Sequence, residues 1–179
     1  MDPRIRLPRA LFAGALAAMA LAPAAQAGPD APDVPTDIQV TAGNKPYLVR
    51  HAEGVQIYGC NGSAWSLIAP RANLYDDQRT VRGTHFGGPT WQDQDGSQVK
   101  ATREAGVTVD PTAIPWLKLK KASTAVGDDG DRLTNTSYIQ RINTTAGLPP
   151  AAGTCTAASA GAIEEIPYTA DYVFWKKTD

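Results

Sequence analysis

The fold is decided by residues 55–68, which read Val-Gln-Ile-Tyr-Gly-Cys-Asn-Gly-Ser-Ala-Trp-Ser-Leu-Ile. The first six residues alternate in character and are rich in β-branched and aromatic side chains, as is typical of a strand. Asn61-Gly62 is a strong signal for a tight turn between two strands. A second short run, Ala64 to Ile68, follows directly. The stretch therefore predicts a β-hairpin.

Similar runs recur along the rest of the chain. Asp95-Gly96 is another turn signal, flanked by Thr90–Asp93 and Gln98–Thr102. Further strand runs, separated by Gly and Pro clusters, are 114–121, 136–142 and 168–176. No segment of a dozen residues shows a helical period with caps, although residues 70–75 are compatible with a short helical turn. The sequence predicts a single all-β domain, either an antiparallel sandwich or a barrel.

The first 27 residues have the composition of a cleavable export signal. Three arginines between residues 4 and 9 precede an apolar stretch, 11–25, and Ala25-Gln26-Ala27 is a typical cleavage site. A membrane anchor is the alternative. The apolar stretch is shorter than the roughly 20 residues that span a membrane, and Pro23 interrupts it. We expect cleavage after Ala27 and a protein that is periplasmic or secreted.

The mature part contains one domain. Of the 179 residues 27 belong to the signal, so 152 remain, enough for one domain with its own core. Residues 28–37 are rich in Pro and Asp, so we expect a mobile leader there and the folded domain over 38–179. The signal holds three of the 17 basic and one of the 18 acidic residues, which leaves a net charge of −3.

This charge balance argues against some partners. Nucleic-acid binding requires a concentrated basic surface, which the sequence does not indicate. No segment after the signal is long and apolar enough to span a membrane.

Cys60 and Cys155 are the two cysteines, and both lie in the mature part. In an oxidising compartment we expect one disulfide between them. The chain-entropy model assigns about 4–5 kcal/mol of stabilisation to so long a loop. A reactive thiol or a metal-binding pair is the alternative, and the absence of a close Cys-x-x-Cys spacing disfavours it.

Five ordered blocks of sequence resemble a known family. They are GVQIYGC (54–60) with Trp65, GTHFGGPTW (83–91) with DGS (95–97), IPWL (114–117), IQRINT (139–144) with Cys155, and PYTADYVF (167–174). Together they resemble an exported family of bacteria and fungi that is catalogued as a domain of unknown function. The resemblance covers nearly the whole mature chain. It implies no established activity and no catalytic residues.

The most unusual segment runs from Gly83 to Ser97. Its Gly-Gly-Pro run, 87–89, imposes an irregular backbone beside His85 and before Trp91. His85 could act as a general base or a metal ligand, or it could simply be hydrogen-bonded in a turn. The only other histidine is His51, and a metal shared by the two with Asp93 or Asp95 has no support from the spacing.

The Asp95-Gly96 turn sets which side chains share a face. In a hairpin with a two-residue turn, Trp91 faces Lys100, and side chains of one face repeat every second residue. Trp91, Asp93, Gln98 and Lys100 would then share a face that could bind a sugar or another polar ligand. Alternatively, Trp91 covers the sheet and Lys100 stacks on its ring.

Two other strands have informative patterns. In residues 114–121, Trp116 and the lysines that follow it share one face, while Leu117 and Leu119 point to the core. Trp116 is thus a candidate for a half-exposed ring. In the run 168–176, apolar side chains occupy both faces, which predicts a central strand.

The leading hypothesis is a non-catalytic binding or envelope-associated module whose partner is a small molecule, a glycan or a protein. Its candidate ligand-binding residues are His85, Trp91, Asp93, Asp95, Lys100 and Trp116. The alternative is a secreted hydrolase that uses His85 and nearby carboxylates. Catalytic residues stay unassigned, because the chain has no Gly-x-Ser-x-Gly elbow. We expect no metal and no cofactor, since zinc, EF-hand and dinucleotide motifs are all absent.

Overall fold

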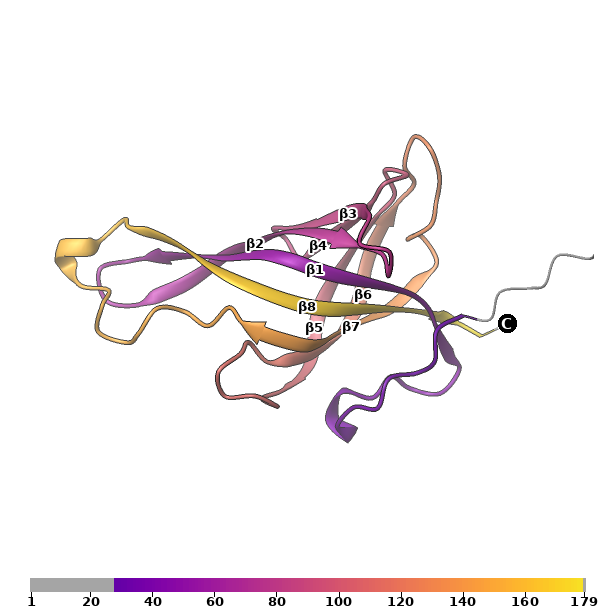
Figure 1. Ribbon diagram of the computed structural model, residues 1–179, viewed down its shortest axis with the longest axis horizontal. Coiled ribbons are helices and arrows are strands. Elements are labelled where there is room, and N and C mark those ends of the chain that lie inside the picture. Colours follow the sequence, from indigo (N-terminus) through magenta and orange to yellow (C-terminus); the bar gives the residue numbers. More distant parts are fainter. Residues whose placement is uncertain (1–27, 179) are drawn as a thin grey trace, which may run out of the picture.

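The computed structural model describes residues 28–178, and the strands in this range form one closed antiparallel barrel (Figure 1). The elements in chain order are η1 (Thr36–Ile38), β1 (Asn44–Cys60), β2 (Trp65–Tyr75), β3 (Val81–Phe86), β4 (Thr90–Asp93), β5 (Gln98–Val107), β6 (Trp116–Ala125), β7 (Thr136–Ala146), η2 (Ala157–Ser159) and β8 (Ile163–Lys177). Each strand pairs with the next one, and β8 closes the barrel against β1. The all-β prediction is confirmed, and of the two architectures the barrel is present.

The first predicted hairpin is confirmed, with a four-residue loop, 61–64, in place of a two-residue turn and with the second strand beginning at Trp65. Cys60 of β1 pairs with Trp65 of β2, and the Asn61 carboxamide oxygen accepts hydrogen bonds from the backbone N–H groups of Ser63 and Ala64. The short helical turn expected over residues 70–75 was wrong, because β2 continues through this segment. There its backbone pairs with β1 on one side and with β3 on the other.

Strands β1, β2 and β8 are long and extend together beyond the other strands as an arm (Figure 1). The predicted disulfide between Cys60 and Cys155 is confirmed. Cys60 ends β1 and Cys155 precedes η2. The bond therefore ties the chain together at the tip of this arm, across a sequence separation of 95 residues.

The main core lies inside the barrel. Trp91, Tyr172 and Phe174 lie at its centre, with edge-to-face contacts from Trp91 to the other two rings. Leu119 is buried in this core and Leu117 packs against it, as their alternation with Trp116 predicted.

A second apolar cluster covers the outside of β8. Val173 and Trp175 belong to it, and Trp116 packs against it. Strand β8 thus buries side chains on both faces, as predicted. The packed part of the chain begins earlier than Ile38, since Val34 is also buried in this cluster. The segment 28–37 was expected to be mobile. Its C-terminal end packs on the barrel through the buried side chains of Val34 and the adjoining Ile38.

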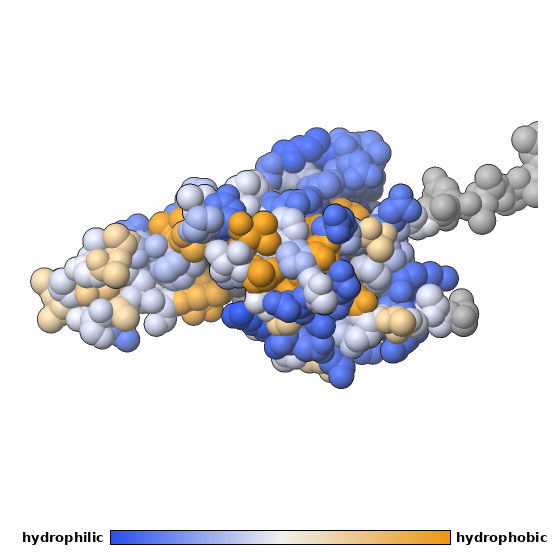
Figure 2. Space-filling model, turned by 90° about the horizontal axis from the view of Figure 1, so that it is seen from below, coloured by the Kyte–Doolittle hydropathy of each residue, from blue (hydrophilic) through white to orange (hydrophobic). Residues whose placement is uncertain are grey.

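The face seen in Figure 2 is largely hydrophilic, with apolar side chains gathered in separate patches. Leu67, Ile68 and Ile163 are exposed apolar residues of the arm. No helix in residues 28–178 has the length and apolar character needed to cross a membrane.

Candidate functional site

The β4–β5 hairpin differs from the prediction by one residue. Trp91 pairs with Val99 and Thr90 with Lys100, because the turn holds three residues, 94–96, with Gly96 in the left-handed region (φ 82°). Three-residue turns of this kind are a common hairpin connection. A shift of one residue exchanges the faces of a strand. Lys100 is therefore exposed on the outside, and the predicted contact between Lys100 and Trp91 was wrong.

Trp91 and His85 lie inside the barrel, with exposed fractions of 1% and 4%. They are directly opposite each other on β4 and β3. Their rings stack with centroids 4.2 Å apart and planes 12° from parallel, and Tyr172 contacts both rings edge-on. The sequence pattern predicted Trp91 on a face of the hairpin that is open to a ligand. In the structure its ring lies inside the barrel.

His85 is a neutral side chain. Burial lowers its pKa to about 3, although a hydrogen bond to the Thr90 carbonyl opposes this shift. Nδ1 lies 2.9 Å from that carbonyl oxygen, so Nδ1 carries the proton and Nε2 is left as an acceptor. A general base works best with a pKa near the operating pH, and the His85 pKa is far below it.

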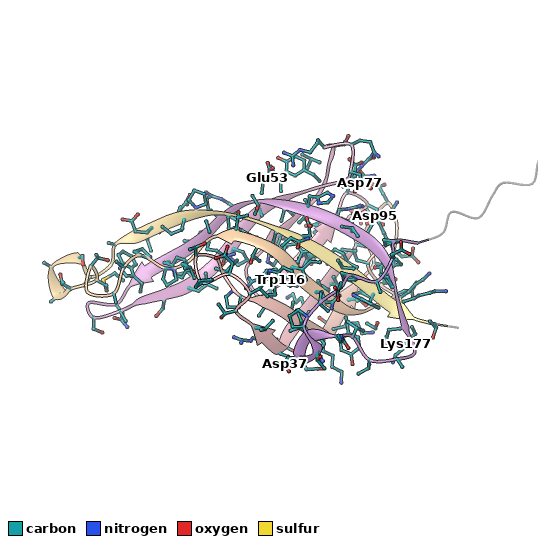
Figure 3. All side chains as sticks on the ribbon, turned by 60° about the horizontal axis from the view of Figure 1, so that its bottom comes forward. Asp37, Glu53, Asp77, Asp95, Trp116 and Lys177 are labelled. Carbon is teal, nitrogen blue, oxygen red and sulfur yellow. A yellow bond between two sulfur atoms is a disulfide. The ribbon has the colours of Figure 1, made fainter. Side chains whose placement is uncertain are left out.

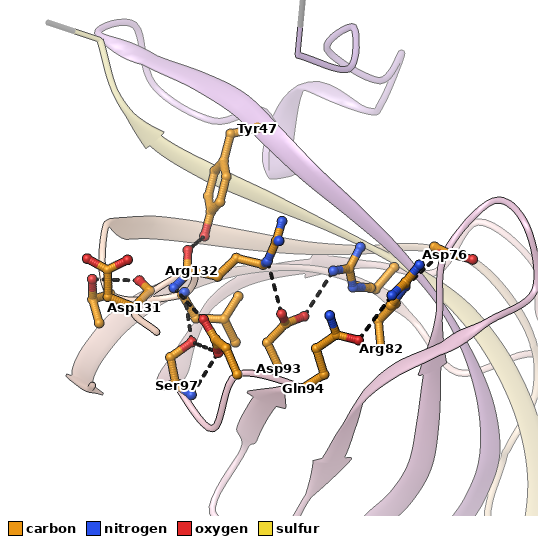
Figure 4. Close-up of polar contacts among 12 residues, drawn as sticks. Tyr47, Asp76, Arg82, Asp93, Gln94, Ser97, Asp131 and Arg132 are labelled. Atoms are coloured by element: carbon orange, nitrogen blue, oxygen red, sulfur yellow. Dashed lines mark hydrogen bonds and ion pairs between the residues drawn. The ribbon is translucent and has the colours of Figure 1, made fainter. Parts of the chain in front are cut away.

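Asp93 is buried between two guanidinium groups (Figure 4). Its carboxylate oxygens lie 2.9 Å from Arg50 Nη2 and 3.0 Å from Arg132 Nε. Arg50 is also buried, so the pair removes two charges from water together. Asp93 therefore forms ion pairs with Arg50 of β1 and Arg132 of the β6–β7 loop and is not free to contact a ligand.

Asp95 shapes the turn that precedes β5. One carboxylate oxygen accepts hydrogen bonds from the Ser97 N–H and hydroxyl, and the other accepts one from the Arg132 N–H. Burial acts to raise the pKa of Asp95, but these hydrogen bonds outweigh it and lower the pKa. Trp116 lies well away from Asp95 (Figure 3). Of the six predicted site residues, the structure brings only His85 and Trp91 together at one cavity.

That cavity has a volume of about 140 Å³ and is bounded by residues of all eight strands and the β3–β4 turn. Apolar side chains form much of its wall, namely Leu67, Pro70, Pro89, Leu117 and Leu119. Its polar residues are Gln56, His85, Trp91, Arg103, Arg141 and Tyr172. We refer to this site as the barrel cavity.

Two buried donors of the barrel cavity have no hydrogen-bond partner among the described residues. They are Gln56 Nε2 and Trp91 Nε1, on side chains with exposed fractions of 2% and 1%. Leaving such a donor unpaired costs about 1–3 kcal/mol, and buried polar groups in native proteins are rarely unpaired. Two residues that line the cavity therefore each carry an unpaired donor.

A bulge in β2 brings Leu67 to the cavity. Ile57 pairs with Ala69 and Tyr58 with Leu67, so Ile68 is an extra residue. The bulge exchanges the faces of the residues beyond it, which places Leu67 at the cavity and Ile68 beside Gly59. A regular strand would have exchanged these two side chains.

Sequence reasoning missed Gln56, Arg103 and Arg141 as site residues. Gln56 lies between Val55 and Ile57 in the alternating run 55–60. Apolar residues are expected to face a core, but here Gln56 is buried while its two neighbours are only partly buried. The sequence showed that side chains alternate between two faces of this strand. The face that carries Gln56, and not the face of Val55 and Ile57, is the one that points into the barrel.

His51 lies outside the barrel cavity, between two carboxylates. Nδ1 is 2.6 Å from Asp171 and Nε2 is 3.0 Å from Asp77. Burial acts to lower the pKa of His51, but the hydrogen bonds and charges of Asp77 and Asp171 outweigh it and raise the pKa. The hollow beside it contains no serine or cysteine. Within the described residues no group of three or more His, Cys, Asp or Glu is placed to hold a metal.

Comparison with known families gives one match. The model of the family described as "Protein of unknown function (DUF3455)" matches residues 41–176, which include the whole barrel cavity. Comparisons with curated proteins and with solved structures give no match.

Proposed function

Because the chain belongs to the DUF3455 family, whose description assigns no activity, we propose a function from the site alone. The protein is a non-catalytic binding module that takes one small molecule into the barrel cavity. The observation that carries this proposal is the pair of buried, unpartnered donors, Gln56 Nε2 and Trp91 Nε1. A ligand with a hydrogen-bond acceptor would satisfy both groups and recover their desolvation cost.

The size of the barrel supports a small ligand. An eight-stranded barrel is just wide enough to be filled by side chains or to hold one small ligand. The cavity of about 140 Å³ is close to the roughly 150 Å³ that holds one benzene molecule in an apolar protein interior. The ligand therefore has an apolar part of about one aromatic ring.

The binding role is favoured over the hydrolase alternative. Among the residues that line the barrel cavity there is no carboxylate, serine or cysteine. His85 is neutral and weakly basic there, and Asp93 is held by Arg50 and Arg132. The constellation expected for acid–base catalysis with His85 is thus not assembled.

The proposal is tested by following the Trp91 indole N–H with NMR while single-ring compounds, benzamide and benzoate, are added. The chain has four tryptophans, and Trp91→Phe assigns the signal of interest. We expect this signal to move more than the other indole signals, and we expect the melting temperature to rise, since a ligand of the native state stabilises it.

Two neighbouring substitutions provide a matched control. Leu67→Trp adds bulk at the cavity and should abolish the response, whereas Ile68→Trp points away from it and should preserve the response. Both residues are about half exposed, at 53% and 58%, so neither substitution disturbs the core. The proposal is wrong if neither compound moves the Trp91 signal at millimolar concentration.

We also propose that the protein is exported and cleaved after Ala27, and that it works in the periplasm or outside the cell. The cleavage pattern at Ala25-Gln26-Ala27 and the disulfide support this. Expression of the full chain in a bacterium, followed by mass measurement of the exported protein, should give Gly28 as the first residue. Retention of an uncleaved chain in the cytoplasm would refute it.

A further inference from the structure

The arginines of residues 28–178 divide into two groups. Five form ion pairs with carboxylates, namely Arg50, Arg71, Arg79, Arg82 and Arg132. Arg103 and Arg141 have no such partner within the described part of the chain, and both line the barrel cavity. Two cations without a counter-ion at one small cavity indicate that the counter-ion belongs to a ligand.

Arg141 is held in place without being neutralised. Its Nε and Nη2 atoms both donate to the Pro115 carbonyl oxygen, at 3.1 and 2.8 Å. The guanidinium also contacts the Tyr172 hydroxyl. These bonds fix its plane, and a guanidinium with five N–H donors keeps others for a further acceptor. Arg50, the buried arginine elsewhere in the barrel, has Asp93 at 2.9 Å. The fold thus supplies a carboxylate to one internal arginine and none to the other.

The polar groups of the barrel cavity are mostly donors. Besides the two arginines, Gln56 Nε2 and Trp91 Nε1 are unpaired donors, and the lining contains no Asp or Glu. A carboxylate is an acceptor-only group with two oxygens, and hydrogen bonds between ionised partners are about twice as strong as neutral ones. It is therefore the group that complements this set of donors.

We propose that the barrel cavity binds a small organic monocarboxylate whose apolar part is about the size of one aromatic ring. The carboxylate is recognised by Arg103, Arg141 and the two unpaired donors, and the apolar part packs against Leu117 and Leu119. This inference rests on the proposed binding function, to which it adds the charge and the chemical class of the ligand.

The experiment compares three probes by isothermal titration calorimetry on the purified, disulfide-bonded protein. Benzoate carries both the ring and the charge, benzamide carries the ring alone, and inorganic phosphate carries charge alone. We expect benzoate to bind at least tenfold more tightly than either of the others. This factor corresponds to the added strength of hydrogen bonds between ionised groups.

Variants identify the groups responsible. Arg103→Gln, an exposed position that carries little folding risk, should weaken benzoate about tenfold and leave benzamide unchanged. Arg141→Gln should weaken benzoate at least as much, and Arg141→Lys should restore part of the loss, since it keeps the charge. Arg71→Gln removes an exposed charge paired with Glu165 and should change neither affinity.

The outcomes separate the two proposals. If benzamide binds as tightly as benzoate, the preference for an anion is refuted while the binding function stands. If phosphate binds as tightly as benzoate, the site takes anions without an apolar part and the monocarboxylate assignment is wrong. If neither ring compound binds, the binding function itself fails.

Discussion

Gln140 and Trp175 are joined by a hydrogen bond of 2.8 Å, from the indole Nε1 to the carboxamide oxygen. The Gln140 Nε2 in turn donates to the Ile38 carbonyl oxygen at 2.8 Å. This buried amide is satisfied at both ends. Gln56 is equally buried, but its Nε2 has no partner. The same residue type thus occupies a structural position on β7 and an unsatisfied one on β1.

The contrast predicts opposite effects of one substitution. Gln56→Met removes an unpaired buried donor and should stabilise the unliganded protein by about 1–3 kcal/mol, while it weakens ligand binding. Gln140→Met leaves the Trp175 indole unpaired and should destabilise by about 1–3 kcal/mol. Urea unfolding of the two variants measures both changes. A loss of stability in Gln56→Met would mean that Gln56 supports the fold and is not kept for a ligand.

Among the acidic residues of the barrel, Asp93 is predicted to be the one whose substitution lowers the free energy of unfolding most. Asp93→Asn leaves the buried Arg50 without a counter-charge and should cost about 3–5 kcal/mol. Glu165→Gln breaks an exposed pair with Arg71 and should cost less than about 1 kcal/mol. Denaturant unfolding compares the two, and equal costs would contradict the role given to Asp93.

His85 should remain neutral over the physiological range. Burial lowers its pKa to about 3, whereas an unfolded histidine titrates near 6.5. Between these values the unfolded chain binds a proton that the folded chain does not, so His85 lowers stability as the pH falls from about 6.5 towards 3. NMR of the imidazole nitrogens should show a neutral ring, protonated at Nδ1, from pH 5 to 8. A midpoint above pH 5 would refute the buried, neutral state.

His51 should behave in the opposite way. Asp77 and Asp171 raise its pKa above 6.5, so its contribution to stability is complete below pH 6.5 and is lost as the pH rises through the raised value. The His51→Gln variant should therefore show a flatter dependence of unfolding free energy on pH above 6.5. Because the chain has only two histidines, this variant also assigns both imidazole signals.

Removal of the disulfide is predicted to lower the free energy of unfolding and to leave the affinity for the ligand unchanged. The double variant Cys60→Ser with Cys155→Ser should lose about 2–5 kcal/mol, as is typical when a native disulfide is removed. The bond closes the tip of the arm, and neither cysteine lines the barrel cavity. Calorimetry at a temperature where the variant is folded should give an unchanged benzoate affinity. A large change would mean that the disulfide shapes the binding site.

Some features followed from local sequence alone. The Asn61-Gly62 turn, the alternation of Leu117 and Leu119 with Trp116, and the two-sided apolar pattern of β8 each depend on neighbouring residues. Local geometry fixes a turn or the two faces of a strand. The pairing of Cys60 with Cys155 was also determined, since the chain has no other cysteine.

Other features depended on the register between paired strands. A turn one residue longer than expected reversed the faces of β5 and removed Lys100 from the site. A bulge at Ile68 likewise placed the Leu67 side chain, and not that of Ile68, at the cavity. Such shifts depend on how strands fit around a closed barrel, which a local pattern does not report.

The sequence by itself determined the class of fold and the disulfide. The tertiary structure decided that His85 and Trp91 lie inside the barrel. It also decided that Gln56, Arg103 and Arg141 line the same cavity. These three residues come from β1, β5 and β7, and only closure of the barrel brings them to one cavity. Whether a polar side chain is paired depends on that closure, because its partners are distant in sequence.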